Sequence, residues 1–160
     1  MIEPGVLLAA WVTALQGTPE LVAALPDPQS ISKYEDGVDG SNLRQAVYEA
    51  GPGSLLVAWN GFGPVRVQGA PNTVLWRHDF SIFVRAWDKS SFGKLCWLLV
   101  EGIPQGGAQK LLHAVIHPAC EAMDVELPRA VRNVLLVGDG KTTIDYFEFK
   151  CGLVERSDIP

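Results

Sequence analysis

The sequence predicts one α+β domain over residues 1–160, with a small mixed or antiparallel β-sheet, including hairpins, packed against two or three helices. Three observations indicate this fold class. The 160 residues match the size of one domain, with no break in composition. Apolar residues near the N-terminus recur at helical spacing. Segments in the middle and at the end of the chain alternate between apolar and polar residues, as strands do.

The first 28 residues predict two helices. Apolar residues between Leu7 and Leu15 recur at three-to-four spacing, which forms one apolar stripe on a helix. Thr18 is a suitable N-cap for a second, short helix, and Pro19 suits its first position. The motif Pro26-Asp27-Pro28 ends that helix.

The following segment predicts a loop and a third short helix. Residues 29–40 are polar and rich in turn-forming residues, which favours a surface loop. Residues 41–48 fit a short helix, which Gly51-Pro52-Gly53 would end.

Two segments in the middle of the chain predict strands. Residues 54–59 form a compact apolar run, and the cluster over residues 60–64 (Asn-Gly-Phe-Gly-Pro) predicts a turn after it. Residues 73–87 alternate, and their apolar face would consist of Phe80, Ile82, Val84 and Ala86. Phe83 and Trp87 lie on the opposite face, so a helix or another subunit must cover that face.

The second half of the chain predicts a helix and a hairpin. Ser90 or Ser91 would cap a helix that stops at residues 102–104. Residues 110–116 fit either a helix or a strand. Residues 132–137 and 142–154 predict a β-hairpin, whose second strand has one face formed by Phe147, Phe149, Cys151 and Leu153. Ile144 is out of phase with that face, so we expect a bulge near residues 145–146.

The composition indicates self-association. Charged residues make up 19% of the chain and apolar residues 48%, which predicts apolar side chains at the surface. The net charge of −5 excludes a basic nucleic-acid grip. The apolar start of the chain lacks the positive segment of a signal peptide and is too short to span a bilayer, so we expect no membrane association. Three scattered cysteines indicate a reducing cytoplasm with buried thiols.

The motifs that resemble catalytic sites do not fit their chemistry. Gly140-Lys141-Thr142 imitates the end of a phosphate-binding loop, but Leu135 stands where that loop needs a glycine. Cys96 and Cys151 lie in apolar runs that are typical of core thiols. His78 and Asp79 would point to opposite faces of a strand. We therefore expect no catalytic residues, no cofactor and no enzyme activity.

One set of residues has a spacing suited to metal ligands. His113, His117 and Cys120 would share a helix face, with Asp124 as a fourth ligand. Pro118 lies inside the set and disfavours the helix that would align it. We therefore expect no metal site, with core packing as the role of these side chains.

Aromatic residues beside the predicted turn are the candidate interface anchors. Trp59 and Phe62 flank the Gly- and Pro-rich cluster, and exposed aromatic residues there would bind a partner. The full set of interface candidates is Trp59, Phe62, Arg66, Phe83 and Trp87.

The order of these elements resembles the tail-terminator and related minor tail or neck proteins of long-tailed bacteriophages. The resemblance spans residues 55–64, 76–86, 92–104 and 132–155, including the stretches Trp-Arg-His-Asp-Phe-Ser-Ile-Phe-Val-Arg-Ala and Asp-Tyr-Phe-Glu-Phe. It rests on element order without an invariant motif, and residues 106–127 depart from the pattern.

The resemblance implies a virion structural protein, made in the host cytoplasm, that forms a ring at the end of the tail tube. The ring is commonly a hexamer. Its implied partners are the tail tube protein and a head-completion or connector protein, with DNA passing through without specific binding. Two alternatives remain: a small metal-dependent or hydrolase-like enzyme built on the histidines, or a cytoplasmic adaptor domain that pairs through a sheet edge.

Overall fold

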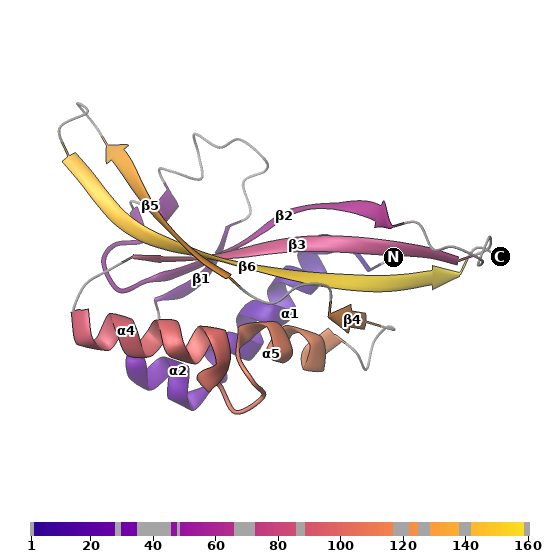
Figure 1. The fold of residues 1–160 in the computed structure, drawn as a ribbon, viewed down its shortest axis with the longest axis horizontal. Helices are drawn as coiled ribbons and strands as arrows, with labels where there is room; N and C mark the ends of the chain where they lie inside the picture. The colour runs from indigo at the N-terminus through magenta and orange to yellow at the C-terminus, as the bar shows by residue number, and fades with distance from the viewer. Residues whose placement is uncertain are drawn as a thin grey trace.

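A computed structural model describes residues 2–27, 30–34, 46–47, 49–65, 73–85, 89–116, 122–124, 129–137 and 142–158. The protein has two layers, a mixed six-stranded sheet and a layer of helices that covers one face of the sheet (Figure 1). The predicted α+β fold class is confirmed.

Helices form where predicted in the first 24 residues and from residue 89 on, and the segment left open between helix and strand, residues 110–116, is helical. They are α1 (Pro4–Gln16), α2 (Pro19–Ala24), α4 (Lys89–Trp97), the π-helical turn η1 (Leu98–Gly102) that continues α4, and α5 (Ala108–Ile116). Thr18 precedes α2 as predicted, but its hydroxyl donates to the Ala14 carbonyl at 2.9 Å and does not cap α2. Among the described helices, none combines the length and apolar composition needed to cross a membrane.

The strands are β1 (Ile31–Tyr34), β2 (Leu55–Val65), β3 (Thr73–Arg85), β4 (Ala122–Asp124), β5 (Arg129–Val137) and β6 (Thr142–Asp158). Their order across the sheet is β1-β2-β3-β6-β4, and β5 also pairs with β6. β1 runs parallel to β2, whereas the other pairs are antiparallel. The predicted hairpin of β5 and β6 is confirmed.

Three local predictions are wrong. Residues 31–34 lie in the predicted loop but form β1, because the parallel pairing with β2 and the burial of Ile31 outweigh a polar local sequence. Residues 60–64 form no turn. They continue β2 after a bulge between Trp59 and Gly61. The third error is the expected bulge near residues 145–146, since the register from Val137↔Thr142 to Arg129↔Lys150 is continuous.

The main core lies between the sheet and the helices. It contains Leu7, Trp11 and Leu15 of α1, Phe80, Ile82 and Val84 of β3, and Phe149, Cys151 and Leu153 of β6. The Trp11 and Phe80 rings meet edge to face, with centroids 5.2 Å apart. The alternation predicted for β3 and β6 is thereby confirmed. The opposite face carries a smaller cluster of Val47, Leu56, Ala58 and Phe83.

A buried side-chain amide joins α5 to the sheet. Gln109 donates from Nε2 to the Gly152 carbonyl at 2.6 Å, and its Oε1 accepts the Gly152 N–H at 2.9 Å. Gly152 lies between the part of β6 that pairs with β5 and the part that pairs with β4. The Gln109 amide therefore takes the place of a neighbouring strand at this position.

Candidate protein interface at the edge of β2

The second half of β2 has a free edge. β1 pairs with β2 only over residues 55–58, whereas β3 pairs with β2 along its whole length on the other side. Within the described parts of the chain, residues 59–65 have no strand on their outer side. An edge of this kind presents backbone N–H and C=O groups that can pair with an incoming strand.

An aromatic cluster supports this edge on the face that carries the helices. The Phe62 ring stacks on Trp59 with centroids 5.8 Å apart and meets Trp76 of β3 edge to face at 5.6 Å. Trp59 is half-buried against the main core, whereas Phe62 is 45% exposed. Phe62 is thus an exposed ring held in place by two tryptophans.

A buried polar pair lies beneath the aromatic cluster. The Nε2 atom of His78 lies 3.1 Å from Oε2 of Glu155, and both side chains are almost fully buried. The other Glu155 oxygen accepts the backbone N–H of Ile2 at 2.7 Å. Nδ1 of His78 is buried and has no hydrogen-bond partner among the described residues. The pair ties the start of the chain to β3 and β6.

Sequence reasoning missed this pair, although a signal existed. His78 is two residues before Phe80 and Glu155 is two residues after Leu153, so both continue the core-facing alternation of their strands. A histidine and a carboxylate in phase with two apolar faces indicate a buried contact. As predicted, Asp79 points to the opposite face from His78, where it pairs with Arg77 at 2.9 Å.

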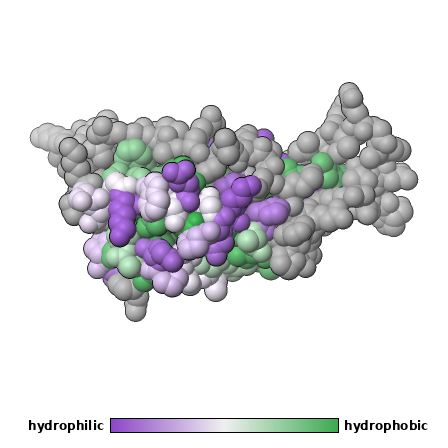
Figure 2. Space-filling model, turned by 60° about the horizontal axis from the view of Figure 1, so that its bottom comes forward, coloured by the Kyte–Doolittle hydropathy of each residue, from purple (hydrophilic) through white to green (hydrophobic). Residues whose placement is uncertain are grey.

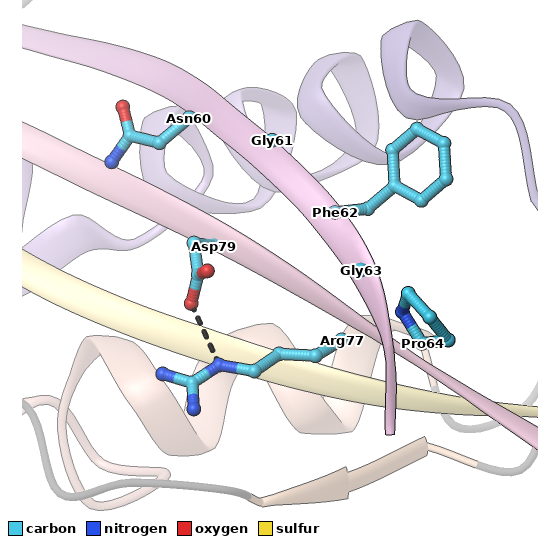
Figure 3. A pocket seen from close by; sticks show the side chains of 7 residues that line it. All are labelled: Asn60, Gly61, Phe62, Gly63, Pro64, Arg77 and Asp79. Carbon is cyan, nitrogen blue, oxygen red and sulfur yellow. Dashed lines mark hydrogen bonds and ion pairs between the residues drawn. The ribbon is translucent and has the colours of Figure 1, made fainter. Parts of the chain in front are cut away.

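A groove lies beside the same edge on the face without helices. Its volume is about 320 Å³, and it is lined by Asn60, Gly61, Phe62, Gly63, Pro64, Arg77 and Asp79. Figure 3 shows Asn60 and the Arg77–Asp79 pair on one side of the β2 ribbon, with Phe62 and Pro64 on the other. The register pairs Gly61 with Asp79 and Gly63 with Arg77, so these residues share a face.

Hydrogen bonds fix the bulge at the start of the groove. The Asn60 amide donates from Nδ2 to the Ser81 hydroxyl at 2.5 Å, and Ser81 donates to Oε1 of Glu148 at 2.7 Å. Ser81 is fully buried. The chain of hydrogen bonds connects β2, β3 and β6, so the bulge and the edge that follows it are held against the sheet.

The five predicted interface residues have different locations. Trp59 and Phe62 lie together at the free edge. Phe83 is a correction, because it is 5% exposed and packs in the smaller cluster with Val47, so another subunit is not needed to cover it. Arg66 and Trp87 lie outside the described residues.

Cys151 is a buried thiol as predicted, whereas Cys96 is only half-buried. Burial raises the pKa of Cys96 to about 11 and that of Cys151 to about 12, so both thiols are neutral near pH 7. His113 lies on α5, whereas His117 and Cys120 fall outside the described residues. The described residues contain no group of three side chains that would hold a metal ion.

Large apolar side chains are also exposed on the helix layer. They are Val6 on α1, Trp97 on α4 and Val100 on η1. Figure 2 shows polar and apolar residues interspersed over this layer. The backbone N–H and C=O groups inside a helix form hydrogen bonds within that helix. The β2 edge instead combines an exposed ring with backbone groups that can form hydrogen bonds to another strand.

The β2 edge offers hydrogen bonds, an aromatic anchor and a groove, which together suit the binding of an extended chain. Neither the protein-family models nor the curated proteins compared with this sequence give a match.

Proposed function

We propose that this protein is a structural subunit that assembles with copies of itself into a closed ring. We further propose that the ring is a tail terminator, or an adjacent neck or minor tail component, of a long-tailed phage. The observation that carries the proposal is the presence of strand edges without partners, among the described residues, on both sides of one sheet.

The two edges differ, which favours a ring over a two-fold dimer. One edge is formed by residues 59–65 of β2, and the other by β4 and β5 beyond β6. When one edge of a copy joins the other edge of the next copy, the contact is heterologous and repeats. Because adjacent strands rotate by about 20–25°, each added copy turns relative to the last, and a suitable total rotation closes the ring.

Phe62 would supply the anchor of this contact. Complete burial of a phenylalanine contributes about 1.5–3 kcal/mol, and 45% of this side chain remains exposed before any partner binds. The two tryptophans already restrict its position, so little side-chain entropy is lost on binding. Rigid aromatic residues of this kind commonly dominate interface energies.

The resemblance in element order supports the location in a virion. It implies that the ring contacts the tail tube protein on one side and a head-completion or connector protein on the other. The net charge of −5 suits a conduit through which DNA passes without being held. A strongly positive potential over the lumen of an assembled ring would contradict this part of the proposal.

The test is assembly of the purified protein, alone and with a tail tube protein, followed by negative-stain microscopy and light scattering. We expect annular particles. Phe62→Ser should weaken assembly roughly tenfold or more, because it removes the anchor. The matched control is Trp97→Ser, which removes another exposed ring on α4 and should leave assembly unchanged. A protein that stays monomeric alone and with the tube protein would refute the proposal.

The free edge also favours a second candidate, an adaptor domain that pairs with a strand of a different protein. Such an adaptor would be monomeric at micromolar concentration. Phe62→Ser would weaken its binding to the other protein and would not change its oligomeric state. Light scattering of the protein alone and with its partner distinguishes the two functions.

A further inference from the structure

We infer that the β5–β6 hairpin of one copy provides the strand that pairs with the free β2 edge of the next copy. The incoming strand would lie beside the groove at Gly61 and Gly63. This inference rests on the proposed function and names the two surfaces that meet.

The hairpin extends beyond the rest of the sheet. Pairing between β3 and β6 begins at Arg85↔Tyr146, so residues 142–145 of β6 pair only with residues 134–137 of β5 within the described chain. Figure 1 shows this end of the hairpin curving away from the helix layer and past the end of β3. A two-stranded hairpin is only marginally stable in water, so a third strand would stabilise it.

The donor segment of β5 and the acceptor segment of β2 are both uncharged. Residues 133–137 read Asn-Val-Leu-Leu-Val and residues 59–65 read Trp-Asn-Gly-Phe-Gly-Pro-Val, so neither contains a charged residue. Exposed edge strands are commonly protected from pairing by charges, prolines or bulges. The β2 edge has no charge, but it has a bulge between Trp59 and Gly61 and a proline at position 64 that donates no N–H, so pairing rests mainly on the backbone groups between them. Because both segments lack charged residues, the backbone pairing itself buries no ion, and the charged groups nearby are Arg77 and Asp79, which already pair with each other in the groove.

The groove has room for a side chain from the incoming strand. Among the described residues, apart from each glycine and its two chain neighbours, no atom lies within 4 Å of the position that a Cβ would take at Gly61 or Gly63. A strand added to the edge would place alternate residues on the face of these glycines. A large side chain packed across an edge glycine compensates for the missing side chain there. The groove thus leaves space beside the edge for the strand that pairs with it.

The positions of the two surfaces allow the contact to repeat. β5 lies beyond β6 on one side of the sheet, whereas the free part of β2 lies on the other side. Each copy therefore has one donor strand and one acceptor edge. The donor strand of each copy can pair with the acceptor edge of the next copy around the ring. A heterologous ring requires this arrangement.

Cysteine cross-linking of the full-length protein tests the inference. One protein carries Gly63→Cys, and it is mixed with proteins that each carry one cysteine at a position from 133 to 137. All carry Cys96→Ser and Cys120→Ser. Disulfides form only between Cα atoms about 4.4–6.8 Å apart. We expect cross-linked dimers whose yield alternates with a period of two along positions 133–137, with at least a threefold difference between neighbouring positions.

The control replaces Gly63→Cys with Glu20→Cys, which lies exposed on α2 and should give low yields without alternation. Rings that form in negative stain without cross-links to position 63, or with yields that do not alternate, would overturn the inference while the proposed function stands. Failure of the unmodified protein to form rings, together with absent cross-links, would refute both.

Discussion

The two halves of the β2–β3 ladder have the same pairing and different surroundings. In the first half, Val57 and Ile82 lie beneath the helices, and β1 covers the outer side of β2. In the second half, a bulge and two glycines lead to an edge on which Phe62 is exposed. β2 therefore contributes to the core at one end and leaves an aromatic side chain exposed at the other.

Substitution of Trp11 should have the largest effect, because this residue of α1 covers the first half of the ladder at Phe80. Its side chain is fully buried against Phe80. We expect Trp11→Ala to lower the free energy of unfolding by about 3–5 kcal/mol. Urea denaturation measures this value. The control is Val6→Ala on the same helix, where 57% exposure predicts a change within about 0.5 kcal/mol. Equal effects of the two would show that α1 does not complete the core.

Loss of the Gln109 amide should have the second largest effect on stability. Gln109→Met keeps the volume but leaves the buried N–H and C=O of Gly152 without partners. Each orphaned group costs about 1–3 kcal/mol, so loss of both partners should lower the free energy of unfolding by at least about 2 kcal/mol. Gln105→Met at an exposed position is the control. If both substitutions are neutral, the amide does not replace a strand at this position.

The smallest effects should be the coupling energies of two polar pairs, one buried and one partly exposed. The His78–Glu155 pair is buried, whereas the Arg77 and Asp79 side chains are 33% and 48% exposed. Double-mutant cycles with leucine at 78 and 155 should give a coupling energy of about 1–3 kcal/mol. Cycles with alanine at 77 and 79 should give about 0.2–1 kcal/mol. A reversed order would mean that burial does not strengthen the first pair.

The long alternating strands are well predicted by the sequence. The short strand β1 and the part of β2 that contains glycine and proline are poorly predicted. β3 and β6 were predictable because each has several core residues in phase, such as Phe80 and Ile82. β1 was not, since Ile31 is the single buried residue of its four. Residues 60–64 carry the glycines and proline of a turn, and only the continued pairing with β3 distinguishes a bulged strand from a turn.

The candidate site was predictable in part. The position of Trp59 and Phe62 beside a Gly- and Pro-rich cluster indicated an aromatic anchor, and both residues lie at the free edge. The His78–Glu155 contact and the Arg77–Asp79 ion pair were not predicted. The first depends on the register between β3 and β6, which periodicity alone does not specify, whereas the second follows from the two-residue alternation of β3, which places Arg77 and Asp79 on one face.

The sequence by itself determined the α+β class, the positions of most helices and strands, and the residues of the apolar faces, because these follow from local spacing and alternation. Only the tertiary structure decided which aromatic side chain is exposed. Phe62 and Phe83 are the same residue type on neighbouring strands, yet Val47 and its neighbours cover Phe83 while Phe62 remains 45% exposed. Exposure depends on which distant segments pack over a residue, and local sequence does not encode that information.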